Sequence, residues 1–165
     1  MISIADVNAM SPKVFIDAFG DVAEHSPWVA READAARPFA SRDALVRQFE
    51  TAIRAANRDA QLALVRAHPD LAGRAKLTDD STKEQAGAGL NTLTAEEFAR
   101  FTDLNTRYRE RFGFPFIFAV KGATKHMILD SFAARVDNDR DAEFETTLQQ
   151  VCRIFRFRIE DRVAP

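Results

Sequence analysis

The sequence predicts an all-α protein: a single-domain helical bundle of about eight helices over residues 1–165, with one extended apolar segment near 112–122. Three observations favour this fold. Helix start and stop signals recur along the chain, apolar residues repeat at helical spacing, and no set of alternating segments offers partner strands for a sheet. A length of 165 residues is enough to bury one hydrophobic core.

The first two predicted helices carry proline near their start. Ser11 and Pro12 have the residue types of an N-cap and a first helical position, and Gly20 predicts the end of that helix. Ser26 and Pro27 repeat the start signal before the next apolar run. Two short helices with a short connection are therefore expected.

Two further helices precede a proline. Ser41 opens a helix whose apolar stripe consists of Leu45, Phe49, Ala52, Ile53 and Ala56. The next helix covers about 59–67 and is expected to stop before Pro69, because proline lacks the backbone N–H and clashes with the preceding turn. This places His68 at the end of that helix.

A capping box is predicted at the start of the fifth helix. Ser81 and Glu84 match the Ser-x-x-Glu pattern, with Ser81 as N-cap and Glu84 at the third helical position. Gln85, Gly87 and Gly89 follow, and glycine permits close approach to the backbone. Free N–H groups at a helix N-terminus also attract anions, so capping and ligand binding are compatible here.

Three more helices are predicted in the second half. Thr94 and Glu97 form another capping box, and that helix is expected to end at Gly113. Its apolar stripe consists of Phe98, Phe101, Leu104, Tyr108 and Phe112. The last two helices are expected near 124–135 and about 139–161.

The segment FGFPFIFAVKG, residues 112–122, departs from this pattern. It is apolar, partly β-branched and bracketed by Gly113, Pro115 and Gly122. It is either an extended segment crossing the core or the start of another helix. In the extended case its N–H and C=O groups lack ladder partners, and a polar ligand would satisfy them.

Composition excludes several functional classes. The formal net charge is −2 and no basic cluster stands apart from acids, so nucleic acid is not an expected partner. No secretory signal and no apolar run of about 20 residues occur, so we expect a cytoplasmic protein without membrane contact. Cys152 is the only cysteine, which excludes an internal disulfide. The 14 phenylalanines are expected to fill the interior.

His68 has two interpretations. An ordinary imidazole pKa of about 6.5 suits proton transfer at neutral pH, and Pro69 restricts the chain beside it. Alternatively, His68 is a partly exposed residue at a helix C-terminus, where a cation is mildly favoured. The motif alone leaves both interpretations open.

Arg158 also has two interpretations. It lies seven residues after Val151 and four after Ile154, so it shares a helix flank with apolar residues. An arginine that leans toward the core usually has a carboxylate or ligand partner, because an unpaired buried charge is costly. Alternatively it buries only its stem and keeps its charge in water. Arg156 is predicted to lie on another face.

Other candidate chemistry is weaker. His25 and His126 are expected to have surface or capping roles. His68, Asp70 and Glu84 match no compact zinc pattern, so we expect no metal. Nucleophile elbows, phosphate-binding loops and dinucleotide fingerprints do not occur. Two alternatives stay open: a metal-dependent hydrolase that uses those three residues, and a non-catalytic helical ligand-binding module.

Four motifs occur in order along the chain: HPDLAG (68–73), STKEQAGAGL (81–90), FGFPFIFAVKG (112–122) and RIFRFRIED (153–161). Together they resemble the 2-oxo-4-hydroxy-4-carboxy-5-ureidoimidazoline (OHCU) decarboxylase family, over nearly the whole chain. The resemblance implies an all-α lyase of urate degradation, a branch of purine metabolism. It implies decarboxylation of OHCU to (S)-allantoin and CO2 without a cofactor.

The resemblance also implies the site. The family's catalytic residues fall on His68, Glu84 and Arg158, with Arg156 as the alternative register for the arginine. The implied substrate-binding residues are Pro69, Ser81, Thr82, Lys83, Glu84, Gln85, Phe116, Ile117, Phe118, Ala119 and Val120. The expected partner is the small-molecule substrate, and a homodimer is a candidate assembly.

Overall fold

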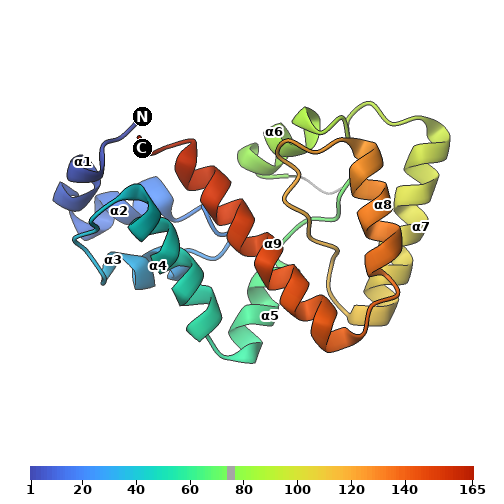
Figure 1. The fold of residues 1–165 in the computed structure, drawn as a ribbon, viewed down its shortest axis with the longest axis horizontal. Helices are drawn as coiled ribbons and strands as arrows, with labels where there is room; N and C mark the ends of the chain where they lie inside the picture. The colour runs from blue at the N-terminus through green and yellow to red at the C-terminus, as the bar shows by residue number, and fades with distance from the viewer. Residues whose placement is uncertain (74–76) are drawn as a thin grey trace. The chain divides into compact units, whose positions relative to one another are not determined.

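The computed structural model describes residues 1–73 and 77–165. This part of the chain contains nine helices, and its extended pairing is limited to a single bridge between Ile2 and Val163 (Figure 1). The helices are α1 (Ile4–Ala9), α2 (Pro12–Phe19), α3 (Trp28–Asp34), α4 (Arg42–Ala55), α5 (Arg58–Arg66), α6 (Asp79–Gly87), α7 (Ala95–Phe112), α8 (Lys125–Arg135) and α9 (Arg140–Glu160). The predicted all-α class is confirmed. Helix α1 was not predicted.

The helices divide between two compact units. The first unit comprises Met1–Ala67 and Cys152–Pro165, and the second comprises His68–Val151. Helix α9 therefore belongs in part to each unit. Among the helices of the described residues, none has the length and apolar character needed to cross a membrane.

Aromatic pairs hold the first unit together. Phe15 and Phe19 lie one turn apart on α2, with ring centroids 4.9 Å apart. Phe49 of α4 meets Phe155 of α9 edge-on at 5.9 Å. All four rings are fully buried, and each such burial stabilises the fold by roughly 1.5–3 kcal/mol.

The second unit is built around a larger aromatic cluster. Phe116 and Phe132 are stacked with their centroids 3.8 Å apart, and Tyr108 packs edge-on against both. Phe101 and Phe114 extend the cluster. These rings come from α7, α8 and the segment between them, so the prediction that phenylalanines fill the interior is confirmed here.

Most of the predicted helix ends are confirmed. Ser11 caps α2, Ser41 caps α4, and Thr94 forms a complete capping box with Glu97 at α7. Helix α7 ends at Gly113, whose φ of 77° is the left-handed conformation that favours glycine.

One predicted start was wrong in its detail. The N-cap of α3 is Pro27, which makes no side-chain cap bond. The hydroxyl of Ser26 donates instead to the carbonyl of Glu24 at 2.8 Å. Pro27 occupies the N-cap position, so Ser26 lies one residue before it. The Ser26 hydroxyl therefore stabilises the loop before the helix and does not cap the helix.

The segment between α7 and α8 is not helical. Residues 115–120 belong to no helix, which decides between the two predicted alternatives against a further helix. Its backbone groups therefore need partners other than those of a helix or a sheet.

Candidate active site

His68 follows helix α5, which ends at Arg66 with Ala67 as C-cap. The imidazole is only 6 % exposed, and its Nε2 atom is buried. The predicted place at a helix end is right, whereas a partly exposed ring is not observed.

The chain turns sharply after His68. The N–H of Gly73 donates to the carbonyl of Asp70 at 3.3 Å, and Ala72 has a φ of 55°. The N–H of Ala72 donates to Oε1 of Gln85 at 3.1 Å. The turn that follows His68 is thus tied directly to α6.

Helix α6, which carries Glu84, begins earlier than predicted. Its N-cap is Thr78, whose hydroxyl accepts the N–H of Ser81 at 3.2 Å. The predicted capping box with Ser81 as N-cap was therefore wrong. Two aspartates in the first turn after Thr78 favour this earlier start, because they complement the helix dipole. The Ser81 N–H is used within the cap rather than left for an anion.

The five predicted residues on α6 differ in exposure. Ser81 and Gln85 are buried one turn apart, and Glu84 is half-buried beside them. Thr82 and Lys83 are exposed. Because positions three and four apart share a helix face, Ser81, Glu84 and Gln85 form one side of α6. Thr82 and Gln85 also line a pocket of about 560 Å3 in this unit.

The apolar segment receives hydrogen bonds from side chains. The carbonyl of Ile117 accepts from Nη1 of Arg135 at 2.8 Å, and the N–H of Ala119 donates to Oε1 of Gln150 at 2.9 Å. The backbone of Phe118 makes no hydrogen bond within residues 1–73 and 77–165. The buried members of the segment are Phe116, Ile117, Ala119 and Val120. The predicted need for backbone partners is met in part by these two side chains.

Arg135 belongs to a buried ion pair in the second unit. Oε1 of Glu143 accepts from Nε of Arg135 at 2.8 Å and from the hydroxyl of Tyr108 at 2.5 Å. Oε2 of Glu143 accepts from the amide of Asn138 at 3.0 Å. Burial, and then the hydrogen bond to Glu143, raises the pKa of Tyr108 above its usual value.

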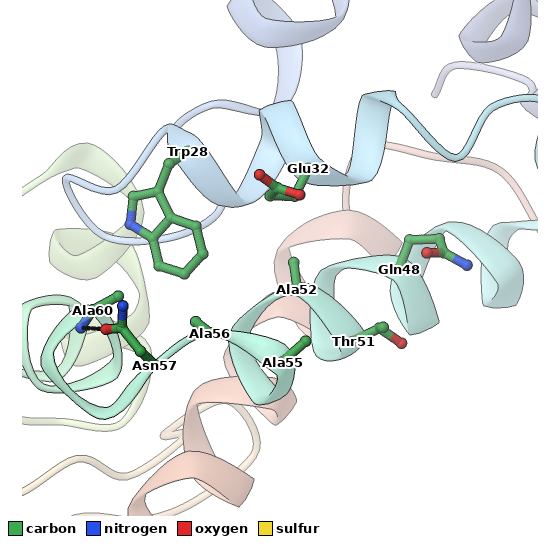
Figure 2. Close-up of a pocket in the computed structure, with 9 residues that line it drawn as sticks. All are labelled: Trp28, Glu32, Gln48, Thr51, Ala52, Ala55, Ala56, Asn57 and Ala60. Atoms are coloured by element: carbon green, nitrogen blue, oxygen red, sulfur yellow. Dashed lines mark hydrogen bonds between the residues drawn. The ribbon is translucent and has the colours of Figure 1, made fainter.

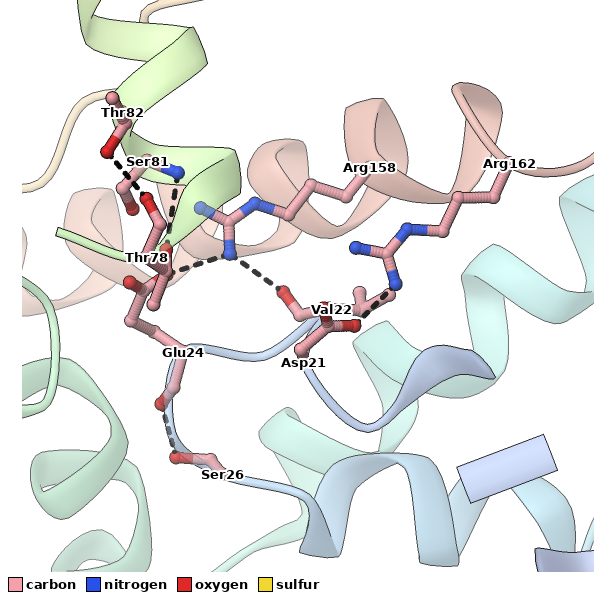
Figure 3. A network of polar contacts seen from close by, with 9 residues as sticks. All are labelled: Asp21, Val22, Glu24, Ser26, Thr78, Ser81, Thr82, Arg158 and Arg162. Carbon is pink, nitrogen blue, oxygen red and sulfur yellow. Dashed lines mark hydrogen bonds and ion pairs between the residues drawn. The ribbon is translucent and has the colours of Figure 1, made fainter. Parts of the chain in front are cut away.

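Arg158 forms a second buried ion pair, in the first unit (Figure 3). Its side chain is 3 % exposed, and its Nη1 donates to Oε2 of Glu24 at 2.8 Å and to the carbonyl of Val22 at 3.2 Å. Arg162, which follows the end of α9, donates to Asp21 at 2.5 Å. Arg158 of α9 and Arg162 beyond its end therefore both bind the loop between α2 and α3.

Arg156 lies in a different environment. Its side chain is 37 % exposed and pairs with Asp43 at 2.9 Å and Glu160 at 3.3 Å. The hydrogen bond from Arg156 lowers the pKa of the Asp43 carboxyl. The predicted difference in helix face between Arg156 and Arg158 is thus confirmed, and the inward side chain is Arg158.

Sequence reasoning missed Glu24, the partner of Arg158. The pattern predicted a carboxylate or ligand partner for an inward arginine but did not indicate which of 25 acidic residues would supply a carboxylate. Glu24 is 1 % exposed and precedes His25, which has a left-handed φ of 47°. A buried glutamate within a loop carries no periodic signal, so only the three-dimensional structure identifies it.

The remaining candidates lie on the surface or in other pairs. His25 and His126 are exposed, as predicted. Asp70 is bound by Arg109 at 2.9 Å. Among the described residues, no group of three or more His, Cys, Asp or Glu side chains has a metal-binding arrangement.

A separate pocket of about 450 Å3 lies in the first unit (Figure 2). Trp28 and Glu32 of α3 face the small side chains of α4 across it, and Asn57, the N-cap of α5, lies at its edge. None of the predicted site residues lines this pocket, so it contributes nothing to the predicted chemistry.

Comparison with known proteins gives consistent matches. The family model described as OHCU decarboxylase matches residues 8–160. A 2-oxo-4-hydroxy-4-carboxy-5-ureidoimidazoline decarboxylase of Haloferax volcanii is 44% identical over 98% of this chain and 96% of its own length. The uric acid degradation bifunctional protein PucL of Bacillus subtilis is 42% identical over 98% of this chain, which corresponds to 33% of that protein. A crystal structure of (S)-allantoin synthase superimposes with a TM-score of 0.79 at 29% identity, covering 98% of this chain and 54% of the other.

Proposed function

The chain belongs to the OHCU decarboxylase family, and from this premise we propose that it is a carboxy-lyase that converts OHCU to (S)-allantoin and CO2 in urate degradation. The observation that carries the proposal is the 44% identity to an OHCU decarboxylase of nearly equal length. The buried side chains of His68 and Arg158 give the proposed reaction its chemistry, without a cofactor.

The substrate itself can accept the electrons of decarboxylation. When the bond between ring carbon and carboxylate breaks, its electron pair forms a new bond to the adjacent carbon, and the ring C=N accepts the displaced pair. The ring nitrogen that receives this pair takes up a proton. A second proton then adds to the former imine carbon, and the hydroxyl loses its proton to become a carbonyl. The enzyme is required to orient the substrate, stabilise the developing charge and deliver the proton to one face.

We assign three catalytic roles. His68 exchanges the proton, because an imidazole titrates near neutral pH. Glu84 accepts a hydrogen bond from the substrate hydroxyl. Arg158 orients the anionic substrate through its planar guanidinium. The burial of His68 and Arg158 supports these roles, because electrostatic interactions are stronger where water is excluded.

The remaining predicted residues are assigned to substrate binding. Pro69 fixes the backbone beside His68, and the buried side of α6 contributes Ser81 and Gln85. The exposed Thr82 and Lys83 belong to the same proposal. The backbone of 116–120 binds polar edges of the substrate, and the lack of a hydrogen bond on Phe118 within the described residues supports this assignment.

Replacing His68 tests the proposal. His68→Asn is expected to lower kcat by about two orders of magnitude or more, because general acid–base catalysis contributes that much. The assay follows the circular dichroism of allantoin formed from fresh OHCU, since spontaneous decay gives the racemate. The matched control is His126→Asn, which alters an exposed histidine. Formation of optically active allantoin at the wild-type rate by His68→Asn would remove His68 from the mechanism.

The register of the arginine has its own test. Arg158→Lys is expected to lose most activity, because lysine cannot reproduce the guanidinium fork. Arg156→Lys, on the exposed surface of the same helix, serves as the control and is expected to remain active. The opposite result would assign the role to Arg156.

We also propose a cytoplasmic homodimer, and light scattering during gel filtration measures the mass of the assembly.

A further inference from the structure

Three side chains from elsewhere in the chain hold the turn that follows His68. Each of them binds one of three consecutive residues of the turn. Asp70 accepts from Nε of Arg109 at 3.0 Å, and the carbonyl of Leu71 accepts from Nδ2 of Asn105 at 2.9 Å. The third bond is that from the Ala72 N–H to Gln85 of α6. All of these residues belong to the second unit.

Helix α7 supplies two of these contacts from one face. Asn105 and Arg109 are four residues apart, so their side chains lie one above the other along the helix. Oδ1 of Asn105 is buried and accepts no hydrogen bond within the described part of the chain. The bond to Leu71 is therefore the one polar interaction that this amide makes there.

The conformation that these contacts hold is an unfavourable one. Ala72 has a φ of 55°, which side chains other than glycine rarely adopt, so the surroundings must impose it. The turn is also tight, because a Cβ on Gly73 would lie 3.1 Å from Cβ of Asp70. A loop left to its own preferences would not keep this shape.

The turn lies close to the start of the second unit. The second unit begins at His68, so residues 70–72 follow its first residue closely. Pro69 lies between them, and its fixed φ limits how far His68 can move independently of the turn. Gln85, which binds Ala72, is next to Glu84 on α6.

We propose that Asn105 and Arg109 are positioning residues for His68. They hold the turn so that the imidazole keeps its place relative to Glu84, which lies in the same unit. The inference rests on the proposed function, because it takes His68 as the group that exchanges the proton. Neither residue needs to touch the reacting atoms.

The first test separates kcat from KM. The double variant Asn105→Leu, Arg109→Met removes both contacts from α7, and kcat is expected to fall by about tenfold to a hundredfold with KM changed less than twofold. Arg109→Lys retains a cation for Asp70 and is expected to recover part of the loss that Arg109→Met causes. The control is Arg107→Met, which removes an exposed arginine two residues away that pairs with Asp103.

The second test follows the position of His68 without any substrate. The chain has only three histidines, so ring Hε1–Cε1 NMR spectra contain three resonances. We expect the double variant to shift or split the His68 resonance and to leave those of the exposed His25 and His126 unchanged. Far-ultraviolet circular dichroism verifies that the variant is folded, which is expected because Arg109 is 48% exposed.

Two results would overturn the proposal: a His68 resonance identical to that of Arg107→Met, or an unchanged kcat in the folded double variant. If the unaltered protein does not turn over OHCU, the proposed function fails by itself. The NMR comparison then still decides whether the α7 contacts position the imidazole.

Discussion

Replacement of Glu143 by glutamine should strongly destabilise the protein. Glu143 is fully buried, Arg135 is 8% exposed at its side chain, and their closest N–O distance is 2.6 Å. The amide removes the negative charge with almost no change in shape. The Arg135 guanidinium then remains buried without a counter-charge, since its other hydrogen bond goes to the neutral carbonyl of Ile117.

The expected loss is about 3–5 kcal/mol in the free energy of unfolding, the usual effect of breaking a buried pair by removing one partner. Glutamine also has an NH2 group in place of one carboxylate oxygen. Tyr108 donates to one of these oxygens and Asn138 to the other, so the NH2 faces a donor in either orientation. For a chain of this size, such a loss lowers the melting temperature by roughly 6–20 °C.

Urea unfolding followed by far-ultraviolet circular dichroism measures the effect. We expect a lower midpoint with an unchanged m-value, because the surface exposed on unfolding stays the same. The matched control is Asp17→Asn, which breaks the Lys13–Asp17 pair at the same 2.6 Å separation but with side chains 84% and 62% exposed. No measurable change is expected there, because solvent screens surface pairs. A similar midpoint for both variants would refute the argument that burial makes the Arg135–Glu143 pair important.

Three further predictions follow. Tyr108 is the only tyrosine, and its pKa is raised in the folded protein. The stability that this shift contributes is complete below the ordinary tyrosine pKa of about 10 and is lost as pH rises further. Tyrosinate absorbance at 295 nm should therefore appear only with unfolding. Hydrogen bonds from Lys125 and Thr94 hold the pKa of Glu97 at about 2. The stability that Glu97 contributes is therefore complete above pH 4.5 and is lost as pH falls toward 2. Lys125→Met should raise the pKa of Glu97, which an NMR titration measures. Gly113→Ala should lower the free energy of unfolding by about 1–2 kcal/mol, because alanine is unfavourable at a positive φ, and urea unfolding measures this.

The sequence was most informative where local chemistry decides the structure. Ser11 was identified as a cap by the proline that follows it, Ser41 by the apolar stripe after it, and Thr94 by Glu97 three residues later. At α6, the capping-box pattern indicated Ser81, and the true cap Thr78, three residues earlier, was not predicted. The true start was less visible because α6 has little apolar periodicity to mark its first residue.

The candidate site was predictable only in its local parts. The place of His68 at a helix end was predicted from the proline that follows it, whereas helical spacing left Arg158 either inward or with its charge in water. Their partners were not predictable, since Glu24 lies 134 positions from Arg158 and Asn105 lies 34 positions from Leu71. Contacts at such separations depend on the folded chain, and no periodicity in a single sequence records them.

The division into two units has a practical consequence for spectroscopy. The first unit contains the only tryptophan, Trp28, and the second contains the only tyrosine. Each unit therefore carries its own natural chromophore. Tryptophan emission and tyrosine absorbance, recorded during the same denaturation, report separately on the two units without any label. Coincident curves identify a single cooperative transition, and displaced curves identify which unit opens first.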